Sequence, residues 1–193
     1  MRNTDMLAAL LLKNLKAQSV ADRNYISGIF QLSYKNLFRE ICRTQDLFIS
    51  SSLKPGDRIV IASSYAPAVA TIYLAGLCFG LVLVVVDAES SGSEANVLIN
   101  AARPKAVFGS AEFINKASSL SNYYDVQVVE LDGQDKRNRP VREWFSKSRV
   151  NKSQFLFLEA FGEPRVQEPL LCDLGEDATA LILFTSGTTS QPK

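Results

Sequence analysis

Histidine is missing from this sequence, and its absence excludes more chemistry than any other feature of the composition. Without it, the 193 residues can build no Ser-His-Asp triad, no Cys-His nucleophile pair and no imidazole site for a metal ion. Any chemistry must therefore rest on carboxylates, lysine, hydroxyl groups or backbone dipoles.

An excess of charge is missing too, because 21 Lys and Arg residues balance 20 Asp and Glu residues. This balance predicts no nucleic-acid partner and no binding to an anionic membrane.

Cysteine is scarce, and Cys42, Cys78 and Cys172 are too far apart to suggest a disulfide framework or a metal site. The apolar run at residues 7–12 is too short for a good signal peptide. We predict reduced core thiols in a cytoplasmic protein, with no metal ligand in the chain.

Residues 59–86 carry no charge, and the run is long enough to cross a bilayer. A membrane span at 59–86 is therefore one reading. Pro67 suits the first turn of a helix and Gly80 suits its end, with β-branched runs on either side. This pattern favours a buried strand, helix and strand, so we expect no stable membrane span. Asp87, which follows, is interpreted as a cap or turn residue.

The rest of the chain alternates in the same way between helix and strand patterns. The expected helices are a first one around 7–15, one at 34–52 capped by Ser33, one at 94–102, and one from Ser110 to about 120. The expected strands are a strand or hairpin at 25–32, then 106–108, 126–130 and a buried strand at 180–184. The alternation predicts an α/β fold with an open, doubly wound, mostly parallel sheet. We expect an N-terminal helix and hairpin in 1–33 and an α/β domain in 34–193.

A hydroxyl-rich loop with a terminal lysine follows the last strand, since residues 185–193 read TSGTTSQPK. Backbone N–H groups, hydroxyls and an ammonium group together suit a polyphosphate. Open α/β sheets bind ligands at the carboxyl ends of their strands, which is where this loop is expected. The spacing of a Walker A loop is absent. On composition alone, an ordinary Ser/Thr/Gly surface turn remains the alternative.

The residues of this loop resemble the signature loop of the adenylate-forming (AMP-binding) superfamily. That superfamily includes acyl-CoA synthetases, luciferases and nonribosomal peptide adenylation domains. Segments upstream also resemble its large domain, namely LKPGDRIVI at 53–61, AGLCFG at 75–80, VVVD at 84–87 and ARPKAVF at 102–108. The resemblance covers about 34–193, and it implies an incomplete N-terminal portion of that large domain.

The resemblance implies a ligase that activates a small-molecule carboxylic acid with Mg-ATP. An acyl-adenylate forms, and coenzyme A or a pantetheine carrier then takes the acyl group. An acyl-CoA synthetase of fatty acid metabolism is the type that we favour. In the loop, the residues implied to donate to ATP phosphate oxygens are Thr185, Ser186, Thr188 and Thr189. Gly187 would allow close backbone approach, and Lys193 would supply the cation.

Ser190 stands where the family pattern most often has glycine, and a Cβ atom there resists positive φ. Its hydroxyl can still donate to phosphate, so we count it with the phosphate-binding residues. The family's adenine, ribose and magnesium contacts and its catalytic lysine follow this loop, so no catalytic residue is assigned here. We therefore expect the 193-residue chain not to form an acyl-adenylate alone.

Two expectations concern partners and stability. The remaining C-terminal portion could be a partner as a separate chain. The final strand is expected to lie inside the intact sheet with later strands beside it, so the truncated chain should have an unpaired, aggregation-prone sheet edge. The alternative to a ligase fragment is a non-catalytic nucleotide- or partner-binding α/β module.

Overall fold

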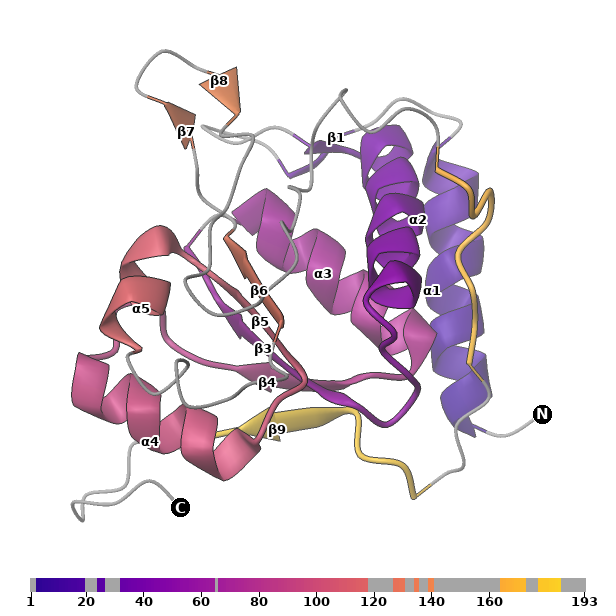
Figure 1. Cartoon of the computed structure of the whole chain (residues 1–193). Helices are drawn as coiled ribbons and strands as arrows, with labels where there is room; N and C mark the ends of the chain where they lie inside the picture. The colour runs from indigo at the N-terminus through magenta and orange to yellow at the C-terminus, as the bar shows by residue number, and fades with distance from the viewer. Residues whose placement is uncertain are drawn as a thin grey trace. The chain divides into compact units, whose positions relative to one another are not determined.

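A computed structural model describes residues 3–19, 24–26, 32–64, 66–117, 127–130, 134–135, 139–140, 164–172 and 177–184 (Figure 1). The chain divides into two compact units that interleave along the sequence. The helical unit comprises Met1–Gly56, Ala66–Val82 and Leu156–Ala180. The sheet unit comprises Asp57–Tyr65, Leu83–Phe155 and Leu181–Lys193.

Three helices form the core of the helical unit: α1 (Asn3–Ser19), α2 (Tyr34–Ser50) and α3 (Ala66–Phe79). Helix α2 packs against both α1 and α3. Two short antiparallel strands, β1 (Asn24–Ile26) and β2 (Leu32–Ser33), pair between α1 and α2, in the region where the sequence predicts a strand or hairpin.

The apolar face of α2 is the centre of this unit. Leu37, Ile41 and Phe48 of α2 are fully buried, as is Ile72 of α3. The rings of Phe48 and Phe79 meet edge to face with centroids 5.5 Å apart, which is a favourable arrangement for aromatic pairs. Burial of these side chains stabilises the three-helix packing.

Both ends of α2 follow from local chemistry. The Ser33 hydroxyl accepts a hydrogen bond from the Asn36 N–H (3.2 Å), which confirms the predicted N-cap. The helix ends at Ser50, two residues before the predicted end, because Ser52 adopts a left-handed backbone with φ +57°. The Leu53 N–H then donates to the Phe48 carbonyl (3.0 Å), which closes the helix end in a Schellman turn.

The uncharged run at 59–86 folds as a strand, a helix and a strand, as predicted: β3 (Arg58–Ala62), α3 and β4 (Val82–Val85). Pro67 lies in the first turn of α3, and Gly80, with φ +83°, follows its last residue. The Leu81 N–H donates to the Gly76 carbonyl (2.9 Å), again as in a Schellman turn. Within the described residues, no helix has both the length and the apolar character needed to cross a membrane.

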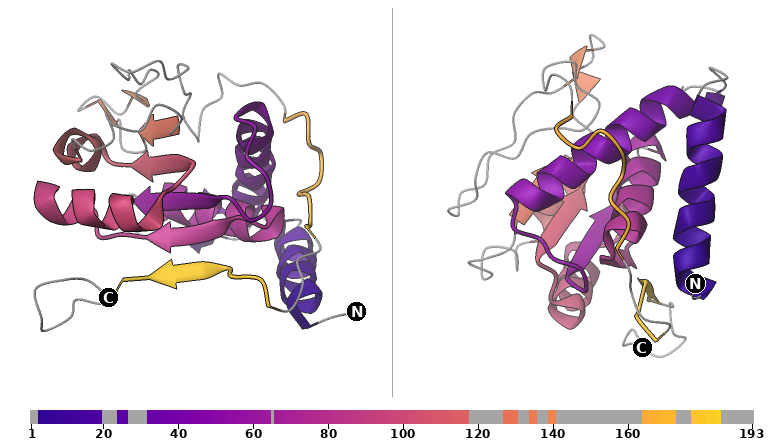
Figure 2. Two further views of the ribbon diagram at one scale, coloured as in Figure 1. Left: turned by 60° about the horizontal axis from the view of Figure 1, so that its bottom comes forward. Right: turned by 90° about the vertical axis from the view of Figure 1, so that its right-hand side faces the viewer.

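The sheet unit contains a five-stranded sheet in the order β6-β5-β3-β4-β9. Its other strands are β5 (Ala106–Gly109), β6 (Gln127–Glu130) and β9 (Leu181–Leu183). Pairing is parallel between β3 and β5, β5 and β6, and β4 and β9. The left view of Figure 2 shows β9 beside β4 and pointing the same way. A separate antiparallel pair joins β7 (Gln134–Asp135) and β8 (Arg139–Pro140). This architecture confirms the predicted α/β class with a parallel sheet.

Helices α4 (Gly92–Ala102) and α5 (Ala111–Lys116) pack against each other and against β3, β5 and β6. Helix α4 begins two residues earlier than predicted, because Ser91 caps it. It ends at Ala102, and the C-cap residue that follows, Arg103, has φ +46° and turns the chain before Pro104. Helix α5 is shorter than the predicted helix, and residues 118–120 lie outside the described residues.

The final strand, predicted at 180–184 as buried within the intact sheet, is an exposed edge strand in this chain. Strand β9 covers only Leu181–Leu183, and among the described strands it pairs with β4 alone, at the edge of the sheet. Leu181 is 37% exposed and Leu183 is 61% exposed. An apolar run shows that a strand is β-prone but not whether neighbours cover it. The expected apolar sheet edge is thus present at β9.

Candidate functional site

The parallel pairing brings the carboxyl ends of the strands to one edge of the sheet unit. Ala62 of β3 is level with Gly109 of β5, and Gly109 is level with Glu130 of β6. On the other side, Val85 of β4 is level with Leu183 of β9. The segments that follow these strands therefore start from a common edge, the usual place for a ligand in an open α/β sheet.

The turn after β4 uses its carboxylates for local structure. The Oδ1 atom of Asp87 accepts a hydrogen bond from the Glu89 N–H (2.9 Å), and the Asp87 carbonyl accepts one from the Ser90 N–H (3.1 Å). This confirms the interpretation of Asp87 as a turn residue.

Ser91 and Glu94 form a reciprocal cap at the start of α4, which the sequence analysis missed. The Ser91 hydroxyl accepts a bond from the Glu94 N–H (3.3 Å), while Glu94 Oε2 accepts one from the Ser91 N–H (2.9 Å). Hydrogen bonds from the Ser91 backbone and hydroxyl hold the pKa of Glu94 below its ordinary value. The S-x-x-E spacing is a sequence signal that could have revealed this capping box.

Ser110 joins the ends of β3 and β5. Its N–H donates to the Ala62 carbonyl (2.8 Å), and its buried hydroxyl accepts from the Phe113 N–H (3.0 Å) as the cap of α5. The predicted cap is thus confirmed, and both polar groups of Ser110 serve the fold.

The segment after β9 begins with Phe184, which is half-buried and is the last described residue. The phosphate-binding residues predicted from the sequence lie outside the described residues; they are Thr185, Ser186, Gly187, Thr188, Thr189, Ser190 and Lys193. The structure shows only where the segment that contains them begins, which is at the carboxyl end of β9, a strand that pairs in parallel with β4.

The cysteines of the described region are free thiols. Burial, with a smaller contribution from the Asp46 carboxylate, raises the pKa of Cys42 to about 12. Burial also raises the pKa of Cys78 to about 11. Both are buried as predicted, whereas Cys172 is half-buried. Within the described part of the chain, no group of three His, Cys, Asp or Glu side chains could hold a metal ion.

Sequence relatives of the chain are ligases. A crotonobetaine/carnitine–CoA ligase of Citrobacter koseri is 29% identical over 165 residues, which is 84% of this chain and 30% of the relative. A putative acyl–CoA ligase of Bacillus subtilis is 25% identical over 167 residues, which is 86% of this chain and 30% of the relative. The chain therefore spans about 30% of the length of these curated relatives.

Solved structures share the fold. Apo MatB from Rhodopseudomonas palustris matches with a TM-score of 0.71 at 22% identity, over 97% of this chain and 33% of that one. A benzoate CoA ligase from Burkholderia xenovorans matches with a TM-score of 0.68 at 18% identity, over 95% of this chain and 33% of that one. A sequence model described as AMP-binding enzyme matches residues 14–193. The chain belongs to the AMP-binding enzyme family.

Proposed function

We propose that this chain is the phosphate-binding part of an ATP-dependent acid–thiol ligase of the acyl-CoA synthetase type. The observation that carries the proposal is the TSGTTSQPK sequence, which starts one residue after β9, a strand that ends at the carboxyl edge of a parallel sheet. Membership of the AMP-binding family and the CoA ligases among its relatives support the reaction class. The chain spans about 30% of those relatives, so the complete reaction is proposed for the whole protein.

The proposed role of the loop is to hold the ATP phosphates. Thr185, Ser186, Thr188, Thr189 and Ser190 donate hydroxyl hydrogen bonds to non-bridging oxygens, and Lys193 offsets their charge. Gly187 has no Cβ atom, which allows the backbone N–H groups to approach the phosphates closely. These donors position and stabilise charge, which is what phosphorus chemistry requires of a protein.

The donor set fits a polyphosphate, since hydroxyls, backbone N–H groups and an ammonium group all favour an anion, and membership of the AMP-binding family makes ATP the proposed nucleotide. When bound, ATP would supply the α-phosphorus that a carboxylate oxygen attacks, with pyrophosphate as the leaving group and an acyl-adenylate as the other product. An ATP-bound MatB structure has the same fold, with a TM-score of 0.65 at 22% identity over 93% of this chain and 33% of that one. Mg²⁺, a small-molecule carboxylic acid and coenzyme A or a pantetheine carrier complete the proposed set of ligands.

With this function we propose a division of the chain into two parts. Residues 34–193 form a partial AMP-binding domain, and residues 1–33 form the helix and the strand or hairpin before it. We also propose a cytoplasmic location and a role in fatty acid metabolism.

Equilibrium dialysis of the 193-residue chain with labelled ATP tests the proposal. Lys193→Gln and Thr188→Ala should each weaken ATP binding at least about tenfold, since hydrogen bonds to charged groups are worth about 1.5–3 kcal/mol. Pyrophosphate should compete, because the loop holds phosphates and not the base.

Two exposed residues of the same types provide matched controls. Thr179→Ala lies before β9 and Lys105→Gln lies at the amino end of β5, so both should leave the affinity unchanged. Absence of ATP binding, or equal losses in the loop and control variants, would overturn the proposal.

A further inference from the structure

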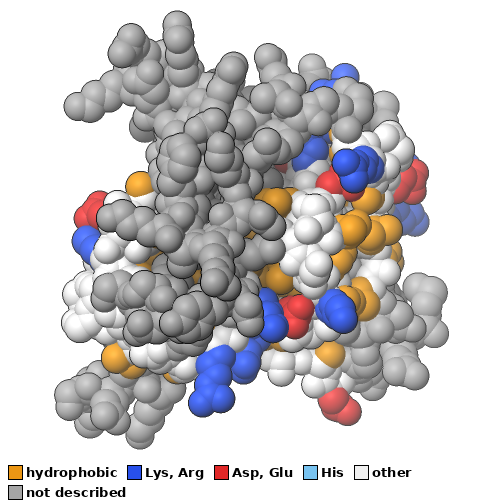
Figure 3. Space-filling model, viewed as in Figure 1, with side chains coloured by type: hydrophobic (Ala, Val, Ile, Leu, Met, Phe, Trp, Pro, Cys, Tyr) orange, Lys and Arg blue, Asp and Glu red, His pale blue; other side chains and the backbone are white. Residues whose placement is uncertain are grey.

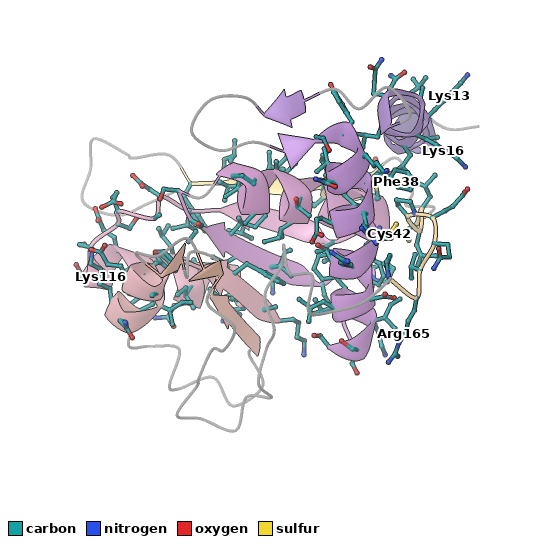
Figure 4. All side chains as sticks on the ribbon, turned by 90° about the horizontal axis from the view of Figure 1, so that it is seen from above. Lys13, Lys16, Phe38, Cys42, Lys116 and Arg165 are labelled. Atoms are coloured by element: carbon teal, nitrogen blue, oxygen red, sulfur yellow. The ribbon has the colours of Figure 1, made fainter. Side chains whose placement is uncertain are left out.

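A segment of the helical unit, residues 164–172, has no helix or strand of its own, yet it lies along α2 (Figure 2, right; Figure 4). We call it the strap. Most of its side chains are exposed, and in the described residues of the strap only Pro164 is buried. Hydrophobic side chains reach the surface on this side of the helical unit (Figure 3). In the strap, Leu170 is 44% exposed and Leu171 is 47% exposed. Apolar burial therefore contributes little to holding the strap in place.

The side chain of Gln45 attaches the strap to both α2 and α3. This residue of α2 is fully buried, and its Oε1 atom accepts a hydrogen bond from the Leu170 N–H (2.6 Å). Its Nε2 atom donates to the Leu170 carbonyl (3.1 Å) and to the Ala75 carbonyl of α3 (3.3 Å). The amide thus pairs with both backbone groups of Leu170, as a neighbouring strand would, and ties them to α3.

The next residue of α2 holds the other end of the strap. Asp46 Oδ2 accepts from the Arg165 N–H (2.6 Å), and Oδ1 accepts from the Val166 N–H (3.2 Å). Figure 4 shows Arg165 beside α2.

Two further contacts attach the strap to the other helices. The Cys172 N–H donates to the Cys78 carbonyl near the end of α3 (2.8 Å). Glu168 forms an exposed ion pair with Lys16 of α1. Exposed ion pairs contribute little to stability, so backbone hydrogen bonds to α2 and α3 carry the attachment.

We propose that the strap is a latch, which opens as a unit while α2 and α3 stay folded, with Gln45 as the residue that controls its opening. Segments held by polar contacts with few buried apolar side chains open at a lower cost than the core does. Loss of the Gln45 amide removes the partner of both backbone groups of Leu170 at once. Pro164 is the one buried side chain among the described residues of the strap, so opening of the strap costs the helices little apolar burial and need not spread to them.

Amide hydrogen exchange of the complete chain, followed by NMR residue by residue, tests the latch. Gln45→Leu should raise the exchange rates of the Arg165, Leu170 and Cys172 N–H groups at least tenfold. Exchange in the centres of α2 and α3 should stay within twofold of the unmodified chain. The matched control is Thr44→Val, because the buried Thr44 hydroxyl bonds only its own helix at the Glu40 carbonyl among the contacts described (2.7 Å). This control should leave strap exchange unchanged.

Hydrogen exchange of the unmodified chain in urea provides a second test, which can be carried out even if Gln45→Leu does not fold. The strap amides should exchange with little dependence on low urea concentrations, because local opening exposes little surface. The centre of α2 should show a steep dependence. A strap whose exchange follows the same urea dependence as α2, or one that Gln45→Leu leaves protected, would overturn the proposal.

Discussion

Two single residues adopt a backbone conformation that residues with a Cβ atom usually avoid. Among the described residues, Ser52 (φ +57°) and Arg103 (φ +46°) are the non-glycine positions with positive φ. Both end helices, at the place where glycine is usually found. The left-handed region costs a residue with a Cβ atom roughly 1–2 kcal/mol.

Ser52→Gly is expected to stabilise the chain. Relief of the left-handed strain outweighs the extra flexibility that glycine gives the unfolded chain, so the free energy of unfolding should rise by about 0.5–1 kcal/mol. Urea unfolding measures the change. Ser51→Gly is the neighbouring control, because Ser51 has φ −85° and gains nothing from glycine. Equal stabilisation by both variants would contradict this explanation.

Burial controls the reactivity of the cysteines. With pKa values of about 12 for Cys42 and about 11 for Cys78, almost no thiolate is present at pH 8. We expect iodoacetamide to label only Cys172 in the native chain, and all three cysteines in urea. Mass spectrometry of the labelled chain gives the count. Rapid native labelling of Cys42 or Cys78 would show that the helical core opens more readily than the structure indicates.

Elements differ in how far the sequence could predict them. Pro67 and Gly80 reveal α3 because a helix start and a helix stop are local signals. The strap has no such signal, because Gln45 meets Leu170 across 125 positions. A buried glutamine in an apolar helix pattern reveals its partner only once the fold brings the two together.

Strand β9 shows a second limit, since its apolar pattern did not distinguish an edge strand from a central one. Residues 178–184 read ATALILF, with no charge to discourage pairing with other chains. Leu183→Lys should therefore lower light scattering of the chain at high concentration several-fold. Val97→Lys is the control, since Val97 of α4 is 47% exposed but is not on a strand. An equal effect of the two variants would show that added charge acts generally and not at the β9 edge.

For the whole molecule, the sequence predicted the family and the fold class, and both are confirmed. The residues of the loop made it possible to predict the family, because the order of residues in a motif identifies a family far more specifically than amino-acid composition does. The roles of Thr185 to Lys193 stay a prediction, since they lie outside the described residues. The described structure supports them at one point, the exit of β9 at the carboxyl edge of a parallel sheet.

The central claim is that residues 185–193 hold the phosphates of ATP. An NMR titration of the 193-residue chain with ATP tests it most directly, by following every backbone amide signal. We predict that the Gly187, Thr188 and Thr189 amides shift most, that pyrophosphate shifts the same signals, and that amides in α1 and α2 stay in place. Saturating ATP that leaves the loop signals unmoved, or moves chiefly those of the helical unit, would contradict the account.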